Sequence, residues 1–263
     1  MEIMQKVQQF VERVKDCLDR DNVLFTSTIE LAGSTSEGTK IYPQDEFDYQ
    51  FKLTHISQCI KADRFIYGDQ VQLCLVSQKS EIWKQVHILE KDYKTLNEAL
   101  LRSFNTAVYN ILQQHSFWKG LPFYWRTCYF KATSPPQTLI APLCLTYIGT
   151  QTYPNLDISI DLVPVIVLDY LPNGMNDLIP PKIVHFVNNS EHLKWDIIVR
   201  ENHARLSFSS IEKLILRNLQ PALKDAYTLA KCLVGCVPEM NRVSPFLQYI
   251  TSYILKKRTI PRA

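Results

Sequence analysis

The chain has 263 residues, of which 46% are hydrophobic and 21% charged, so it can bury a core and is not generally disordered. Seven glycines against 14 prolines exclude collagen-like and glycine-linker architectures. The formal net charge of +3 is too small by itself to indicate a nucleic-acid or membrane binder. Five basic and no acidic residues follow Glu239, which leaves 24 basic against 26 acidic residues before them. The excess of positive charge is therefore confined to the end of the chain.

The N-terminal segment and the cysteines both bear on the compartment. Charges interrupt every apolar run in residues 1–20, so this segment predicts an amphipathic helix and not a signal peptide. The longest uncharged run, residues 132–156, holds four prolines and is not expected to span a membrane. Seven cysteines form no C-x-x-C pair, as expected of reduced thiols. We therefore expect a cytoplasmic or nuclear protein without a membrane partner.

The apolar spacing predicts a series of elements. In chain order they are a helix over 3–20, a strand over 25–33 that ends at a glycine, a polar loop over 34–44, a strand over 45–53, further strands over 64–90, a helix over 95–115, a hairpin of 138–149 with 156–168, and helices from about 206 onward. This order predicts an α+β fold in which a mixed twisted sheet and a long N-terminal helix form a core over 1–200. A helical lobe over 201–263 follows.

Acidic residues alternate with apolar residues on two of the predicted strands. In D-E-F-D, Glu46 and Asp48 share one strand face while Phe47 turns into the core. In D-I-S-I-D-L-V, Asp157 and Asp161 likewise share a face, and one of them is expected to join the first pair across a neighbouring strand. Three carboxylates repel one another unless a cation lies between them, and hard divalent ions take oxygen ligands. The pattern favours Mg²⁺, and two such ions are the usual device for phosphoryl transfer.

A glycine and a serine at the end of the preceding strand add a candidate phosphate site. Gly33 lets backbone N–H groups approach phosphate oxygens closely, and Ser34 adds a hydroxyl donor. Taken singly, each motif has a plainer interpretation. An E-x-D on a strand is usually a solvated face, and the later aspartates suit charges at a hairpin edge that discourage aggregation. The ordered combination of the motifs favours a nucleotide site.

This combination resembles a known family. The stretch AGSTSEGTKIYPQDEFDYQFKL closely resembles the signature of the nucleotidyltransferases related to cyclic GMP-AMP synthase, the male-abnormal-21-like family that includes the animal cGAS-like receptors. LDISIDLVPVIVL is similar to the family's third-aspartate strand, and RLSFSSIEKLIL to the start of its helical lobe. ALKDAYTLAK and ITSYILK resemble the two helices that supply its base-stacking and phosphate-contacting side chains.

The resemblance implies a role for each matching residue. The metals would be held by Glu46, Asp48 and Asp161, with Asp161 also acting on the attacking hydroxyl, and the donor triphosphate by Gly33 and Ser34. The other nucleotide-contacting positions implied are Arg205, Ser207, Ser209, Glu212, the phosphate-binding Lys231, and Ser252, Tyr253 and Lys256 of an S-Y-x-x-K match in which the tyrosine stacks on a base. The implied cofactors are two Mg²⁺ or Mn²⁺ ions, and the implied substrates are ATP and GTP.

Three departures from the family pattern refine this expectation. Residues 216–223 contain no His or Cys, so the zinc-binding thumb of the DNA-sensing members is not expected, and double-stranded RNA is the favoured activator over DNA. Val163 stands where the DNA-sensing synthase has a threonine that reads guanine. The chain stops ten residues after Tyr253, so the helical lobe is expected to be incomplete.

Three functions follow from these observations. The leading expectation is a metal-dependent nucleotidyltransferase that makes a cyclic dinucleotide or oligonucleotide in innate immune signalling. The alternative is a catalytically inactive member of the same family that binds nucleotides or acts as a scaffold. An α+β interaction domain with acidic strand faces would require all five motif matches to be accidental.

Overall fold

A computed structural model gives the arrangement of the chain. It describes residues 2–40, 45–67, 70–76, 81–82, 84–86, 93–125, 142–149, 155–175, 179–201 and 203–235. The chain divides into two compact units, one of Met1–Leu31 with Gln44–Phe208 and the other of Ala32–Pro43 with Ser209–Ala263.

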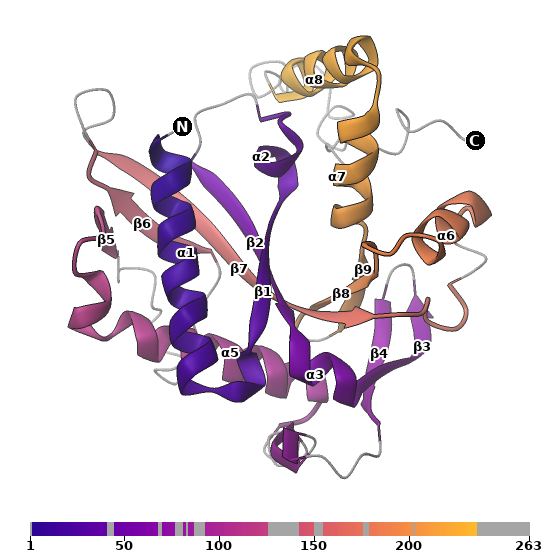
Figure 1. Cartoon of the computed structure of the whole chain (residues 1–263), viewed down its shortest axis with the longest axis horizontal. Helices are drawn as coiled ribbons and strands as arrows, with labels where there is room; N and C mark the ends of the chain where they lie inside the picture. The colour runs from indigo at the N-terminus through magenta and orange to yellow at the C-terminus, as the bar shows by residue number, and fades with distance from the viewer. Residues whose placement is uncertain are drawn as a thin grey trace, which may run out of the picture. The chain divides into compact units, whose positions relative to one another are not determined.

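The described strands form one mixed sheet, which belongs almost entirely to the first unit (Figure 1). They are β1 (Ser27–Ala32), β2 (Glu46–Leu53), β3 (Ile60–Tyr67), β4 (Gln70–Leu75), β5 (Phe123–Trp125), β6 (Leu143–Tyr147), β7 (Leu156–Leu168), β8 (Trp195–Val199) and β9 (Ala204–Ser207). The main order is β1-β2-β7-β8-β9-β4-β3, and β6 pairs with both β5 and β7. β2 and β7 run parallel, whereas β6 and β8 run antiparallel to β7.

The long strand β7 has strand partners on both sides, but none of them pairs with its whole length. β2 pairs with residues 159–165, while on the other side β6 pairs with 156–160 and β8 with 165–168. Among the described residues, 161–164 therefore have a strand partner only in β2. Pro164 suits this place, because a proline cannot donate a ladder hydrogen bond. Asp161 lies in the same segment, 161–164, which has no partner among the described strands on the side opposite β2.

Two helices cover one face of the sheet and build the core. They are α1 (Glu2–Asp21) and α5 (Leu96–Leu112). Phe104 of α5 makes edge contacts with the rings of Phe25 and Phe51, and the hydroxyl of Tyr49 on β2 donates to Gln8 of α1. The apolar positions that predicted these helices are all buried: Ile3, Val7, Phe10, Val11, Val14 and Leu18 of α1, and Leu96, Leu100, Phe104, Val108, Ile111 and Leu112 of α5. Both predicted helices are confirmed.

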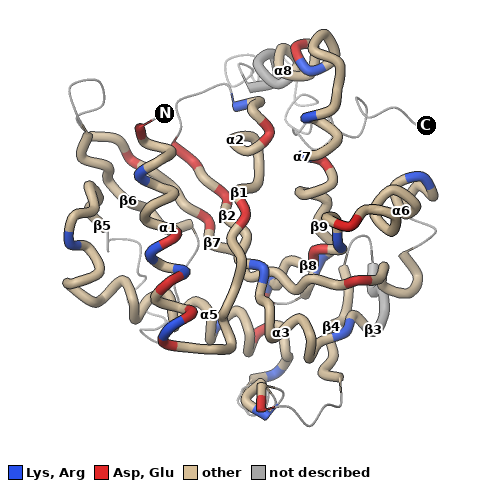
Figure 2. The backbone as a smooth tube through the Cα atoms, viewed as in Figure 1, with Lys and Arg blue, Asp and Glu red and all other residues tan. Residues whose placement is uncertain are grey.

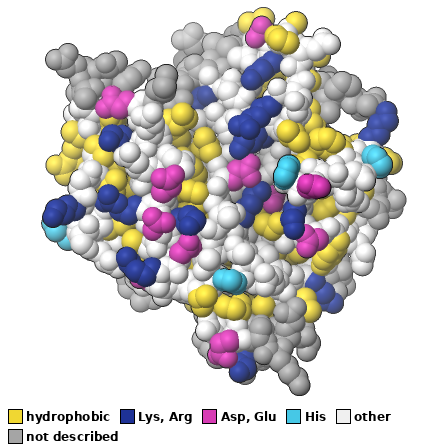
Figure 3. Space-filling model, viewed as in Figure 1, with side chains coloured by type: hydrophobic (Ala, Val, Ile, Leu, Met, Phe, Trp, Pro, Cys, Tyr) yellow, Lys and Arg dark blue, Asp and Glu magenta, His cyan; other side chains and the backbone are white. Residues whose placement is uncertain are grey.

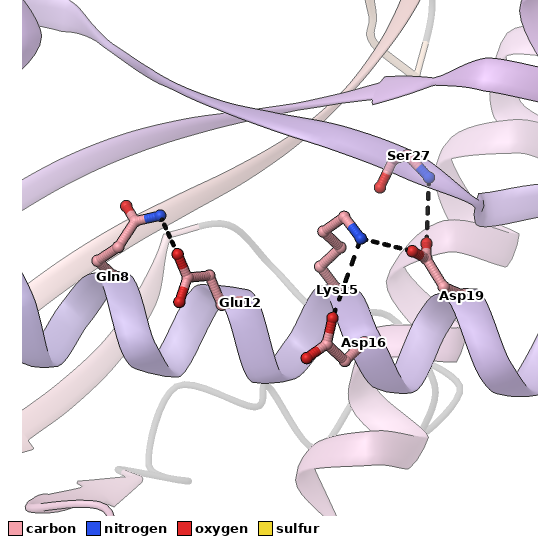
Figure 4. A network of polar contacts seen from close by, with 6 residues as sticks. All are labelled: Gln8, Glu12, Lys15, Asp16, Asp19 and Ser27. Atoms are coloured by element: carbon pink, nitrogen blue, oxygen red, sulfur yellow. Dashed lines mark hydrogen bonds and ion pairs between the residues drawn. The ribbon is translucent and has the colours of Figure 1, made fainter.

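Polar contacts tie the C-terminal part of α1 to β1 (Figure 4). The carboxylate of Asp19 accepts from the backbone N–H of Ser27 at 3.1 Å and lies 2.6 Å from the ammonium of Lys15. Asp16 is 3.9 Å from the same ammonium and is largely exposed. Over α1, acidic and basic side chains lie side by side on the surface (Figure 3). This pairing of opposite charges fits the small net charge.

Shorter helices complete the first unit. They are α3 (Thr54–Cys59), α6 (Pro181–Asn188) and the 3₁₀ turns η1 (Val23–Phe25) and η2 (His115–Trp118). The guanidinium of Arg13 on α1 donates to the carbonyl oxygens of Phe117 and Lys119, both at 2.8 Å, and so holds η2 against α1. In the described part of the chain, no helix is long and apolar enough to cross a bilayer.

The second unit consists of short helical elements. They are α2 (Gly33–Glu37), α7 (Ser209–Asn218) and α8 (Pro221–Gly235), and α2 packs against α7. The predicted helices after residue 206 are confirmed for α7 and α8, while the third predicted helix, over 244–256, lies outside the described residues.

Two local predictions are wrong. The polar loop expected over 34–44 begins as the helix α2, which ends at Gly38 in the left-handed conformation with a φ of 67°. The strand expected after residue 80 is helical at 81–82 and 84–86. There Ile82 and Val86 are four residues apart, which places both on one helix face, and Lys84 pairs with Glu81 three residues earlier. A short apolar run does not distinguish a strand from a helix by itself.

The broader expectation is confirmed: the chain is a mixed α+β protein with a mixed sheet and a long N-terminal helix. The hairpin of β6 and β7 is also as predicted. β8 and β9 form a further hairpin that carries the sheet on to Ser207. The division into a core over 1–200 and a lobe over 201–263 stays a prediction.

Candidate functional site

The acidic pair of β2 lies on the face of the sheet opposite the core. Phe47 and Tyr49 are each 1% exposed and point into the core, whereas Glu46 and Asp48 are exposed. This alternation follows from the period of two in a strand, and it confirms that the two carboxylates share a face.

The parallel register with β7 places a third carboxylate beside this pair. Asp48 lies directly opposite Asp161, and Glu46 lies opposite Ser159. The register continues one residue earlier, where the N–H of Ser159 donates to the carbonyl oxygen of Asp45. Adjacent strands lie about 4.8 Å apart, so directly opposite side chains on one face are neighbours. The acidic positions of β2 and β7 are coloured in Figure 2.

The register also decides between the two aspartates of β7. Asp157 lies beyond the end of the paired segment of β2 and faces Thr146 of β6, whose hydroxyl donates to it at 3.2 Å. Asp161 is the one that stands opposite a β2 carboxylate. The candidate site on this unit is therefore formed by Glu46, Asp48 and Asp161, which we call the carboxylate triad.

Asp161 occupies an environment that favours a cation. Its Oδ1 atom is buried and has no hydrogen-bond partner among the described residues. Burial raises the pKa of this carboxyl above its usual value, and the nearby guanidinium of Arg200 opposes the shift. A buried carboxylate oxygen without a partner is costly, and a bound divalent ion would satisfy it. By this test the residues present fit Mg²⁺ or Mn²⁺.

The side chains themselves do not form a preformed metal site. Within the described ranges, no three His, Cys, Asp or Glu side chains converge closely enough to hold a metal ion. Carboxylates that share a site without a cation repel one another and turn apart. The backbone register is thus the feature that brings the triad together, and binding would require side-chain rotation.

Gly33 and Ser34 begin α2 in the second unit. Gly33 has a φ of 66°, which disfavours residues with a side chain, and it directly follows the end of β1. The carbonyl oxygen of Ser34 accepts from the backbone N–H of Thr39, and Ser36 donates its hydroxyl to the carbonyl oxygen of Gly33. The predicted position of this pair at the strand end is confirmed.

Two further predicted residues lie on β9. Arg205 is half-buried, and Ser207 is 6% exposed and stands opposite Asp196 of β8. The amide of Gln50 on β2 donates to the hydroxyl of Ser207 at 3.4 Å. Ser207 thus acts in this structure as a partner inside the protein. Direct contact with a nucleotide would require this hydroxyl to give up its hydrogen bond with Gln50.

The remaining predicted residues belong to the second unit. Ser209 and Glu212 lie in the first turn of α7, and Lys231 falls within α8. Ser252, Tyr253 and Lys256 lie outside the described residues. Their roles stay predictions.

One residue of the site was missed by the sequence analysis. Arg200 is exposed and directly follows the last residue of β8. Its positive charge lowers the pKa of Asp161 and so opposes the effect of burial. Only the register of β7 with β8 brings these two residues near each other, so the sequence carried no local signal for the pairing. A cation at this edge is suited to a phosphate group.

Comparison with known proteins gives no family assignment. No protein-family model matches the chain, and no curated protein matches it. The family resemblance therefore rests on the motifs in the sequence.

Proposed function

We propose that the chain is a metal-dependent nucleotidyltransferase that uses ATP and/or GTP as substrates. The product would be a cyclic dinucleotide or a short oligonucleotide made in innate immune signalling, and a ligand such as double-stranded RNA would activate the enzyme. The observation that carries the proposal is the parallel register that sets Asp48 opposite Asp161, with Glu46 on the same face. A strand that is acidic only because its surface is solvated would not require a half-buried aspartate opposite it on the next strand.

The residues of the triad suit a transfer at the α-phosphorus. The attacking hydroxyl loses its proton, its oxygen bonds to the α-phosphorus, and the bond to the β-phosphate oxygen breaks, so that pyrophosphate leaves. Two divalent ions, when bound, would lower the pKa of the hydroxyl and neutralise charge on pyrophosphate. Asp161, which stands opposite Asp48, would hold an ion and act on the attacking hydroxyl, as the family resemblance implies.

Other residues would bind and orient the nucleotides. Arg200 and Arg205 supply guanidinium groups on the β8–β9 hairpin, where they suit phosphate oxygens. The backbone N–H groups after Gly33 and the hydroxyl of Ser34 suit the donor triphosphate. The positive φ of Gly33 supports this role, because it keeps the start of α2 free of a side chain.

Product analysis tests the proposal. Purified protein is incubated with Mn²⁺ and all four nucleoside triphosphates, with double-stranded RNA, double-stranded DNA or no activator, and products are identified by mass spectrometry. We expect pyrophosphate and a linked nucleotide product, and an Asp48→Ala variant is expected to lose at least about 100-fold in rate, as for loss of a metal ligand.

Asp157→Asn is the matched control. Asp157 lies on the same strand and face as Asp161 but pairs with Thr146, so its substitution should leave the rate unchanged. Nucleotide binding without any product under all conditions would favour the inactive, nucleotide-binding alternative. Equal rates for wild type and Asp48→Ala would refute the catalytic proposal.

A further inference from the structure

A cluster of three charged residues lies on the site face of the sheet, away from the triad. The ammonium of Lys52 on β2 is 2.8 Å from Oε2 of Glu30 on β1 and 2.9 Å from Oδ2 of Asp196 on β8. Asp196 is 1% exposed, and the side chain of Lys52 is 20% exposed. Burial lowers the pKa of Lys52, but the carboxylates of Asp196 and Glu30 raise it overall. We call these residues the Lys52 cluster.

The cluster spans several strands. Lys52 lies on the same face of β2 as Asp48, because the two residues are four apart in a strand. In the pairing register Lys52 stands opposite Val165 of β7, which in turn stands opposite Ile198 of β8. The ammonium therefore reaches past the fully buried Val165 to its partner on β8. One side chain of β2 is thus bound to both β1 and β8.

Stability alone is a weak reason for such a cluster. Desolvation of buried charges offsets much of their attraction, and apolar residues of similar volume are often as stable. Buried ionic groups can instead specify one arrangement over its alternatives. Here the alternative that matters is a shift in strand pairing, since a slip of one residue between β2 and β7 would turn Asp48 to the other face. The same slip would turn Lys52 to the other face, away from both carboxylates.

We propose that Lys52, Glu30 and Asp196 are positioning residues that hold β2 in the register that places Asp48 opposite Asp161 for metal binding. This inference rests on the proposed function, because the register matters for metal binding only if the carboxylate triad holds metal ions. A second contact also links β2 to a strand beyond β7. Gln50, between Asp48 and Lys52 on the same face, donates to Ser207 on β9. Two side chains of β2 therefore bind strands beyond β7, next to the acidic pair.

The test compares metal affinity with fold stability. A triple variant, Glu30→Gln with Lys52→Met and Asp196→Asn, removes all three charges of the Lys52 cluster together. Mn²⁺ binding to the full chain is measured from the loss of the free-ion signal in electron paramagnetic resonance, well below the melting temperature. Thermal melting in EDTA is recorded in parallel. Lys194→Met is the matched control, because it removes a lysine whose partner Asp169 is exposed.

The triple variant is expected to bind Mn²⁺ about tenfold more weakly than wild type, the lower end of the effect of groups that orient metal ligands. Lys194→Met should bind as wild type does. Should the triple variant fail to fold, Glu30→Gln alone removes the most exposed member of the cluster and is expected to weaken Mn²⁺ binding in the same direction. Unchanged Mn²⁺ affinity in a folded variant of the cluster, with only the melting temperature altered, would overturn the positioning role.

An Asp48→Asn variant separates this inference from the proposed function. If wild type binds Mn²⁺ and Asp48→Asn does not, the proposed metal site stands and the cluster variants decide the inference. If wild type binds no Mn²⁺ through Asp48, the proposed function falls, and the positioning role falls with it.

Discussion

Replacement of Asp161 by asparagine should stabilise the protein while removing its proposed activity. The substitution keeps the shape of the side chain but removes a negative charge from a half-buried position. An unpaired buried acceptor costs about 1–3 kcal/mol, and more for a charged group. The partial exposure of Asp161 and the nearby Arg200 guanidinium reduce this cost. We therefore expect Asp161→Asn to raise the free energy of unfolding by about 0.5–1 kcal/mol, or the melting temperature by about 1–4 °C.

The pH dependence supplies an internal check. Because burial raises the pKa of Asp161 in the folded state, the ionised form destabilises the fold at neutral pH. Near pH 4, close to the ordinary pKa of an aspartate, much of the carboxyl is protonated in both the folded and the unfolded chain, so the difference between the two proteins should be clearly smaller than at pH 7. The gain of the variant should thus grow as the pH rises through the folded-state pKa.

Urea unfolding in EDTA at pH 7 and at pH 4 measures the effect, and Mn²⁺ provides the control. A metal that binds the folded state stabilises it by mass action, so added Mn²⁺ should stabilise wild type more than Asp161→Asn. A variant that is less stable than wild type in EDTA at pH 7 would refute the account of this side chain, since it would mean that the carboxylate already has a favourable partner.

Three further substitutions test the fold and the site. Phe104→Ala should lower the free energy of unfolding by about 3–5 kcal/mol in urea titrations, because it opens a cavity between α5 and the sheet; a loss under 1 kcal/mol would contradict this packing. Gly33→Ala and Gly120→Ala should each lower the free energy of unfolding by about 1–2 kcal/mol, because both glycines have a positive φ. Only Gly33→Ala should weaken ATP binding in calorimetry, and equal ATP affinity in both variants would argue against a phosphate role of Gly33. In thermal melting, Asp19→Ala should lower the free energy of unfolding by about 1.5–3 kcal/mol, and Asp16→Ala by under about 1 kcal/mol. Similar losses in the two variants would show that the hydrogen bond from Ser27 to Asp19 does not anchor α1.

The elements with a long apolar period could be predicted from the sequence. The spacing of Val7, Val11 and Val14 in α1 specifies a helix face, and each of these residues is fully buried. The alternation of Glu46, Phe47 and Asp48 likewise specified which side chains share a face. Such patterns are local, since they depend only on the period of the helix or strand.

The arrangement of the site could be predicted only in part. The sequence offered both Asp157 and Asp161 as partners of the acidic pair, and the strand register, which depends on tertiary packing, favours Asp161. Arg200 and Lys52 carry no local signal, because each acquires its role from a residue on another strand. Short segments were also uncertain: α2 has five residues and owes its start to the conformation of Gly33.

The proposed function requires that carboxylates from β2 and β7 form one metal site. Anomalous diffraction from crystals grown with Mn²⁺ and a non-hydrolysable ATP analogue tests it most directly. We expect one peak, or two about 3.5–4 Å apart, bound within about 2.5 Å by carboxylate oxygens of both Asp48 and Asp161. A map with no peak between these two residues, in crystals that contain the bound nucleotide, would contradict it.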